Sequence, residues 1–119
     1  MASKKAQPAS EKVVLYDKLI ATNPAIERKG DANPYTSLNG NMFTLLQGSN
    51  TLAIRLPEDE REKFVKKYKT TLFSAYGVVM KEYVAVPDAL LPRTKELQKY
   101  LEISYEYART LKPKPTRKR

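Results

Sequence analysis

Four carboxylates gather in one short stretch of this chain. They are Glu58, Asp59, Glu60 and Glu62. Carboxylates at this spacing could hold a divalent cation, or act as a general acid and a general base. A proline precedes the cluster and several lysines follow it, so the acidic residues would occupy the first turn of a helix, at the positive end of its dipole. Because this position explains the cluster without chemistry, we predict no metal site and no catalytic residue here.

A second group of polar side chains falls in predicted strands. Lys81 and Tyr83 lie two residues apart in an apolar run, so alternation places them on the same face of a strand. Arg55 ends another strand that we expect in the same sheet. The three side chains form a candidate patch for an anion or a protein partner, and the alternative is an ordinary exposed sheet face with cross-strand pairs. Glu82 falls on the opposite, apolar face, where a carboxylate needs an ion pair or a place at the sheet margin.

Histidine and cysteine are both absent from the 119 residues. Their absence removes thiol nucleophiles, disulfides, the usual general base near neutral pH and nearly all structural zinc ligand sets. The chain has only four glycines, and none has the spacing of a nucleotide-binding loop. No motif supports a lysine and tyrosine acid–base pair. We therefore expect no enzymatic activity and no cofactor.

The net charge of +9 indicates that polyanions are one class of partner. Residues 112–119 alone carry a net charge of +5, so much of the basic character lies outside the apolar body. Such residues attract nucleic acid without reading its sequence. The residues that we predict to contact nucleic acid are Lys66, Lys67, Lys112, Lys114, Arg117, Lys118 and Arg119.

The first half of the chain predicts one helix followed by strands. Apolar residues at helical spacing indicate a helix over residues 11–22, with Ser10 as its N-cap. Asn39 followed by Gly40 favours the positive φ values of a tight hairpin turn. The strands predicted are a short one at residues 26–29 and three antiparallel ones at residues 35–38, 41–47 and 51–56.

The second half predicts two helices on either side of a long strand. The elements are a helix over residues 57–69, a connector at 70–74, a strand over 76–87, a single turn at 88–91 and a helix over 95–111 with Thr94 as its N-cap. In the strand, alternation places Met80 on one face with Val84 and Val86, and places Tyr83 with Ala85 on the other.

These elements predict one α+β domain over residues 13–111. We expect two layers, with a mostly antiparallel sheet and helices packed on one of its faces. Residues 1–12 and 112–119 are rich in charge and proline and are expected to be disordered basic segments. The N-terminus lacks the apolar core of a secretory signal and no apolar run is long enough to span a membrane, so we expect a cytoplasmic protein.

The order of these landmarks resembles the N-terminal domain of the TfoX/Sxy family. The resemblance spans about residues 14–112 and is carried by the hairpin sequence LNGNMF at 38–43, TLAIRLPEDER at 51–61, the strand at 80–87 and YARTL at 107–111. It implies a two-layer α+β domain without recognised catalytic residues. Full-length competence regulators of this family continue into a second helical domain, so we expect a stand-alone copy of the first domain.

Two functions follow as expectations. The first is a non-enzymatic interaction module that binds another protein through its sheet face or an exposed strand edge. The resemblance implies that such a module acts as a regulatory accessory protein in transcription or competence. The second is an accessory protein that binds nucleic acid weakly and without sequence preference. The chain is expected to be a monomer or a homodimer that binds a further protein.

Overall fold

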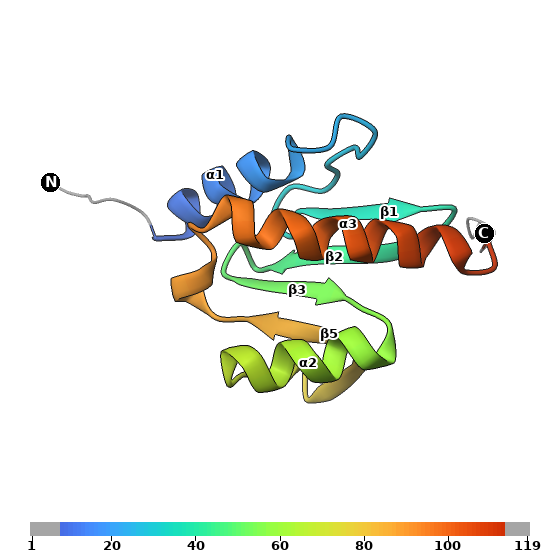
Figure 1. The fold of residues 1–119 in the computed structure, drawn as a ribbon. Helices are drawn as coiled ribbons and strands as arrows, with labels where there is room; N and C mark the ends of the chain where they lie inside the picture. The colour runs from blue at the N-terminus through green and yellow to red at the C-terminus, as the bar shows by residue number, and fades with distance from the viewer. Residues whose placement is uncertain (1–7, 114–119) are drawn as a thin grey trace, which may run out of the picture.

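Tight turns fold the middle of the chain into antiparallel strands (Figure 1). The computed structural model describes residues 8–113. Asn39 and Gly40 have φ values of 54° and 82°, and Tyr76 and Gly77 have φ values of 55° and 76°, so both pairs make hairpin turns that need two left-handed residues. The strands are β1 (Tyr35–Leu38), β2 (Asn41–Gln47), β3 (Thr51–Arg55), β4 (Leu72–Ala75) and β5 (Val78–Val86).

The five strands form one sheet in the order β1-β2-β3-β5-β4, and every neighbouring pair is antiparallel. β1, β2 and β3 form the predicted meander. α2 (Glu58–Tyr68) leads from β3 to β4, so that β5 returns beside β3 and leaves β4 at the edge. β4 is a strand that the sequence analysis does not predict, because it assigns residues 70–74 to a connector.

Three helices cover one face of the sheet (Figure 1). They are α1 (Pro8–Ile20), α2 and α3 (Thr94–Thr110), with a short 3-10 helix, η1 (Asp88–Leu90), before α3. Tyr16 of α1, Phe64 of α2 and Leu97 of α3 are completely buried against β2, β3 and β5. The fold is therefore the predicted two-layer α+β arrangement, with its main core between the helices and the sheet.

A smaller apolar cluster lies on the face of the sheet that the helices leave uncovered. Phe73 of β4 and Tyr83 of β5 are 2% and 8% exposed, and Ala53 of β3, in the same cluster, is fully buried. Met80 packs against this cluster. The predicted face of Met80, shared with Val84, is therefore wrong.

An irregularity in the pairing of β4 with β5 explains this difference. Leu72 pairs with Val84, but Ser74 pairs with Val79, so three extra residues of β5 lie between these two pairs. Each extra residue reverses the alternation of side chains, and three of them bring Met80 to the face of Tyr83. A strict period of two therefore holds only for the end of β5 that pairs with β3.

Three local predictions at the helix starts and the first strand are also wrong. α1 begins at Pro8, so residues 8–10, which were predicted to precede the helix in a disordered segment, are helical and Ser10 lies inside the helix. The N-cap of α3 is Arg93, and the Oγ1 atom of Thr94 is buried without a hydrogen-bond partner among residues 8–113. In the predicted strand at 26–29, only Lys29 pairs, through a single bridge to Tyr35.

Across the helices of residues 8–113, none has both the length and the apolar character needed to cross a membrane.

Candidate functional site

The predicted patch of Arg55, Lys81 and Tyr83 is divided by the structure into two places. Arg55 and Tyr83 are direct partners in the β3–β5 pairing, and the guanidinium of Arg55 lies 5.6 Å from the centre of the Tyr83 ring. Lys81 is exposed and lines a different region beside α2. The predicted shared face of Lys81 and Tyr83 is wrong, because the irregular part of β5 falls between Val79 and Val84.

Arg55 is the centre of an ion pair at the end of the sheet. Its Nε and Nη2 atoms both lie 2.6 Å from Oε1 of Glu82, and its Nη1 donates to the backbone carbonyl of Met42 at 3.3 Å. The ring of Tyr107 from α3 also lies near it, with the centroid 6.0 Å from the guanidinium carbon. The predicted ion pair for Glu82 is confirmed. Since these contacts occupy Arg55, its role is structural.

Tyr83 is equally committed to the fold. Its ring is buried in the smaller cluster, and its hydroxyl donates to the carbonyl of Met42 at 2.6 Å. Burial raises the pKa of Tyr83, and the nearby Arg55 opposes this shift. Burial likewise raises the pKa of Tyr107, with the Glu82 carboxylate adding to the effect. The prediction of Tyr83 as an exposed contact residue is therefore corrected: its side chain lies inside the domain.

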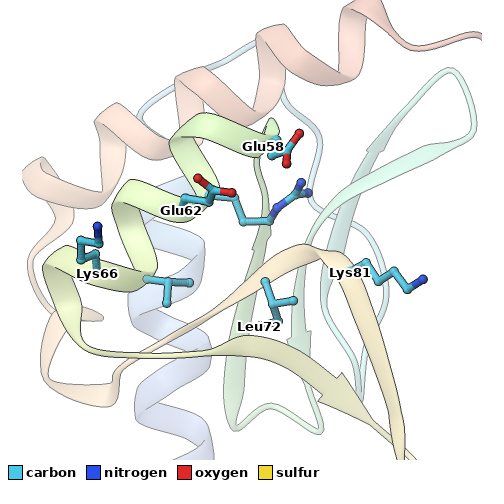
Figure 2. Close-up of a pocket in the computed structure, with 7 residues that line it drawn as sticks. Glu58, Glu62, Lys66, Leu72 and Lys81 are labelled. Carbon is cyan, nitrogen blue, oxygen red and sulfur yellow. The ribbon is translucent and has the colours of Figure 1, made fainter.

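Lys81 instead lines a groove between α2 and the edge of the sheet (Figure 2). The groove has a volume of about 620 Å³. Leu72 of β4 and Val65 of α2 supply its apolar surface. Its charged residues are Glu58, Arg61, Glu62, Lys66 and Lys81.

The carboxylate cluster lies where the sequence predicted it, on the first turns of α2. Glu58, Asp59 and Glu60 form the first turn, while Lys66 and Lys67 lie in the last one, so the charges follow the helix dipole. Within residues 8–113, no group of three or more potential metal-ligating side chains is placed to hold an ion. The helix dipole thus accounts for the position of the cluster.

An exposed apolar surface lies next to this groove, on the hairpin that joins β4 to β5. Tyr76, Val78 and Val79 are 89%, 63% and 53% exposed, and Leu72 is 37% exposed. The pairing of β3 with β5 ends at Tyr83, so the hairpin extends beyond β3 with only β4 as a strand neighbour. Together with the groove, these four residues define what we call the edge surface. Large apolar side chains gathered in this way are typical of interaction sites.

The sequence contained a signal for this surface. Tyr76–Gly77 stands between two short runs with apolar residues, which is the pattern of a two-residue hairpin. The prediction of one long strand over residues 76–87 places Tyr76 and Gly77 inside that strand, and it therefore misses both β4 and the exposed end of the hairpin.

The predicted nucleic-acid contacts are not gathered on one face. Lys66 and Lys67 lie at the C-terminal end of α2, and the ammonium of Lys67 lies 5.3 Å from the ring centre of Tyr68. Lys112 follows α3, and its carbonyl accepts a hydrogen bond from Asn41 at 3.0 Å. The C-terminal ends of α2 and α3 lie at opposite ends of the domain (Figure 1). The remaining predicted contacts lie outside the described residues; these are Lys114, Arg117, Lys118 and Arg119.

Comparisons with protein-family models, with curated proteins and with solved structures give no significant match to this chain.

Proposed function

We propose that this domain is a non-enzymatic interaction module and that the edge surface is where it binds protein. The observation that carries the proposal is the exposure of Tyr76, Val78 and Val79 on one protruding hairpin. A hairpin of this kind offers both apolar side chains and unpaired backbone groups, which are the two components of binding by strand addition. A regulatory accessory role in transcription is the part of the proposal that rests on the resemblance to the TfoX N-terminal domain.

The state of two buried tyrosines, Tyr16 and Tyr83, supports a structural role for them over catalysis. The hydroxyl of Tyr16 lies 2.6 Å from that of Thr44, and the hydroxyl of Tyr83 donates to a backbone carbonyl. Burial is the largest cause of the raised pKa of each. A phenol that is buried and held in this way stabilises the fold and has no access to a substrate proton.

Site-specific photo-crosslinking in cells tests this function. A photoreactive phenylalanine analogue at Tyr76 should form a covalent adduct with protein, either with a second copy or with another chain. The matched control position is Val14, which is 65% exposed on α1, outside the edge surface. Protein adducts that are no stronger at Tyr76 than at Val14 would show that the hairpin is not a docking surface.

The net charge of +9 supports a second candidate function, the weak and sequence-independent binding of nucleic acid. Fluorescence anisotropy with single-stranded and duplex DNA tests it on the full chain and on a chain that ends at Leu111. We expect binding that falls as salt rises from about 50 to 200 mM and that weakens strongly on truncation. Equal binding by the two chains would exclude a role for residues 112–119.

A further inference from the structure

The two edges of the sheet differ in how well they are protected. The start of β1 is closed by Lys29, which exchanges two backbone hydrogen bonds with Tyr35 at 2.8 and 2.9 Å. No strand from residues 8–113 pairs with the outer side of β4. The sequence of β4, Leu-Phe-Ser-Ala, contains neither a charge nor a proline, although these are the usual means of preventing contact between open edges. β4 is therefore the edge that is open to another strand.

The charges of α2 that line the groove are mainly acidic toward its N-terminal end and basic toward its C-terminal end. Glu58 and Glu62 line the groove in the first half of the helix, and Lys66 lines it near the C-terminal end. Arg61 also lines the first half, but its Nη1 donates to the carbonyl of Leu56 at 3.3 Å, which leaves this half with a net negative charge. If a second α2 lies alongside in the antiparallel direction, each acidic half faces a basic half. The groove is thus electrostatically complementary to its own copy under a two-fold rotation, which is the commonest symmetry of soluble dimers.

We propose that the edge surface binds a second copy of this chain in a two-fold symmetric dimer. β4 pairs antiparallel with β4 of the second copy, which joins the two sheets into one. The two α2 helices then lie antiparallel on the same side of that sheet, with Glu62 of each copy opposite Lys66 of the other. This inference rests on the proposed function, because it names the occupant of the same surface.

The spacing of strands and helices is compatible with this arrangement. α2 packs over β5, so the two copies of α2 would be separated by three strand spacings, or roughly 14 Å. This exceeds the usual contact distance of about 8–10 Å between packed helices, so the two helices would not pack directly and side chains would fill the space between them. Leu72 and Val65 of both copies lie in the intervening space, and the long side chains of Glu62 and Lys66 can meet across it. The exposed Tyr76 would lie beside the start of β4 of the second copy.

A dimer explains one feature that a monomer leaves without a partner. Leu72 lies on the helix-covered face and pairs with the buried Val84, yet it is 37% exposed. In a continuous sheet Leu72 lies beside the joined strands, where the second copy covers it.

Charge exchange on α2 tests the dimer. We expect sedimentation equilibrium of the full chain to give twice the 13.6 kDa of one chain. Glu62→Lys or Lys66→Glu places like charges opposite each other twice per dimer, and each should weaken self-association about 10-fold or more. The double variant Glu62→Lys with Lys66→Glu should regain the wild-type affinity. An equal mixture of the two single variants should also dimerise, because both facing pairs are then of opposite charge.

Matched controls come from the same helix. Asp59 and Lys63 are exposed and have the same spacing but do not line the groove. Asp59→Lys and Lys63→Glu should leave self-association unchanged. Circular dichroism of each variant separates loss of pairing from loss of folding.

A wild-type chain that stays at the monomer mass at millimolar concentration would overturn the dimer. So would single variants that associate as tightly as the controls, or a mixture of folded single variants that fails to dimerise. If the chain is monomeric while Tyr76 still crosslinks to a different protein, the dimer is wrong and the proposed function stands. If the chain is monomeric and Tyr76 forms no protein adduct, both are wrong.

Discussion

Replacement of Arg55 by methionine, which keeps the length of the side chain but removes its charge, should destabilise the domain by about 2–3 kcal/mol. Two of its nitrogens lie 2.6 Å from the Glu82 carboxylate, and the side chains of Arg55 and Glu82 are only 16% and 39% exposed. The variant also loses the contacts with the rings of Tyr83 and Tyr107. It leaves a carboxylate that is half-buried and unpaired.

The contribution of the pair itself follows from a double-mutant cycle of Arg55→Met with Glu82→Gln. A hydrogen bond to a charged group contributes about 1.5–3 kcal/mol, and an exposed ion pair contributes about 0.2–1 kcal/mol. Because this pair is partly screened by water, we expect a coupling free energy of about 1.5 kcal/mol. The matched control is the cycle of Arg109 with Glu106, whose side chains are 58% and 62% exposed at a distance of 3.3 Å. Its expected coupling is below about 0.5 kcal/mol.

Urea and thermal unfolding followed by circular dichroism measure both cycles. A loss of about 2–3 kcal/mol in a domain of this size lowers Tm by roughly 8–20 °C. The reasoning fails if the coupling of Arg55 with Glu82 is no larger than that of Arg109 with Glu106. It also fails if Arg55→Met leaves Tm unchanged.

Three further changes test other parts of the fold. Burial raises the pKa of Tyr16 from 10.0 to about 12. Its stabilising contribution is therefore complete below pH 10 and is lost at about 1.4 kcal/mol per pH unit as pH rises to 12. Tyr16→Phe should lose less stability between pH 8 and 11 than the wild-type chain, and an equal loss would contradict this. Gly77 has a φ of 76° and no atom within 4 Å of an added Cβ. Gly77→Ala should therefore lower the free energy of unfolding by about 1 kcal/mol through the backbone alone, and Gly77→Asn should lower it by less. Equal stability of all three chains would show that the turn changes conformation. Phe73→Ala should cost about 3–5 kcal/mol in urea unfolding, as for a core residue, and a cost below about 1 kcal/mol would mean that the smaller cluster contributes little.

The sequence predicted the parts of this fold that depend on short-range patterns. The Asn39–Gly40 turn, the strands β1, β2 and β3 and the lengths of α2 and α3 agree with the structure to within one or two residues. Each of these depends on residues that are close in sequence: a turn dipeptide, alternation or helical periodicity. These local signals predict the elements correctly because each element has one buried face that sets its pattern of apolar residues.

The candidate site was harder to predict because it depends on register. Lys81 and Tyr83 are two residues apart, yet they lie in different environments because of three extra residues in β5. No pattern within the strand marks such an irregularity. The contacts of Arg55 required the knowledge that β3 and β5 are neighbours, which follows from strand order and not from local sequence.

The strand order has a consequence for how the chain folds. Every neighbouring pair of strands is joined by a tight turn except β3 and β5, between which the chain passes through α2 and β4. Closing that connection brings together residues such as Arg55 and Glu82, which are 27 apart in sequence. The meander of β1, β2 and β3 and the hairpin of β4 and β5 can therefore form early from local contacts, and their docking is the step that has to overcome the larger loss of chain entropy. The rate of folding should be governed by the pairing of β3 with β5, where the ion pair of Arg55 with Glu82, the ring of Tyr83 and both apolar clusters come together.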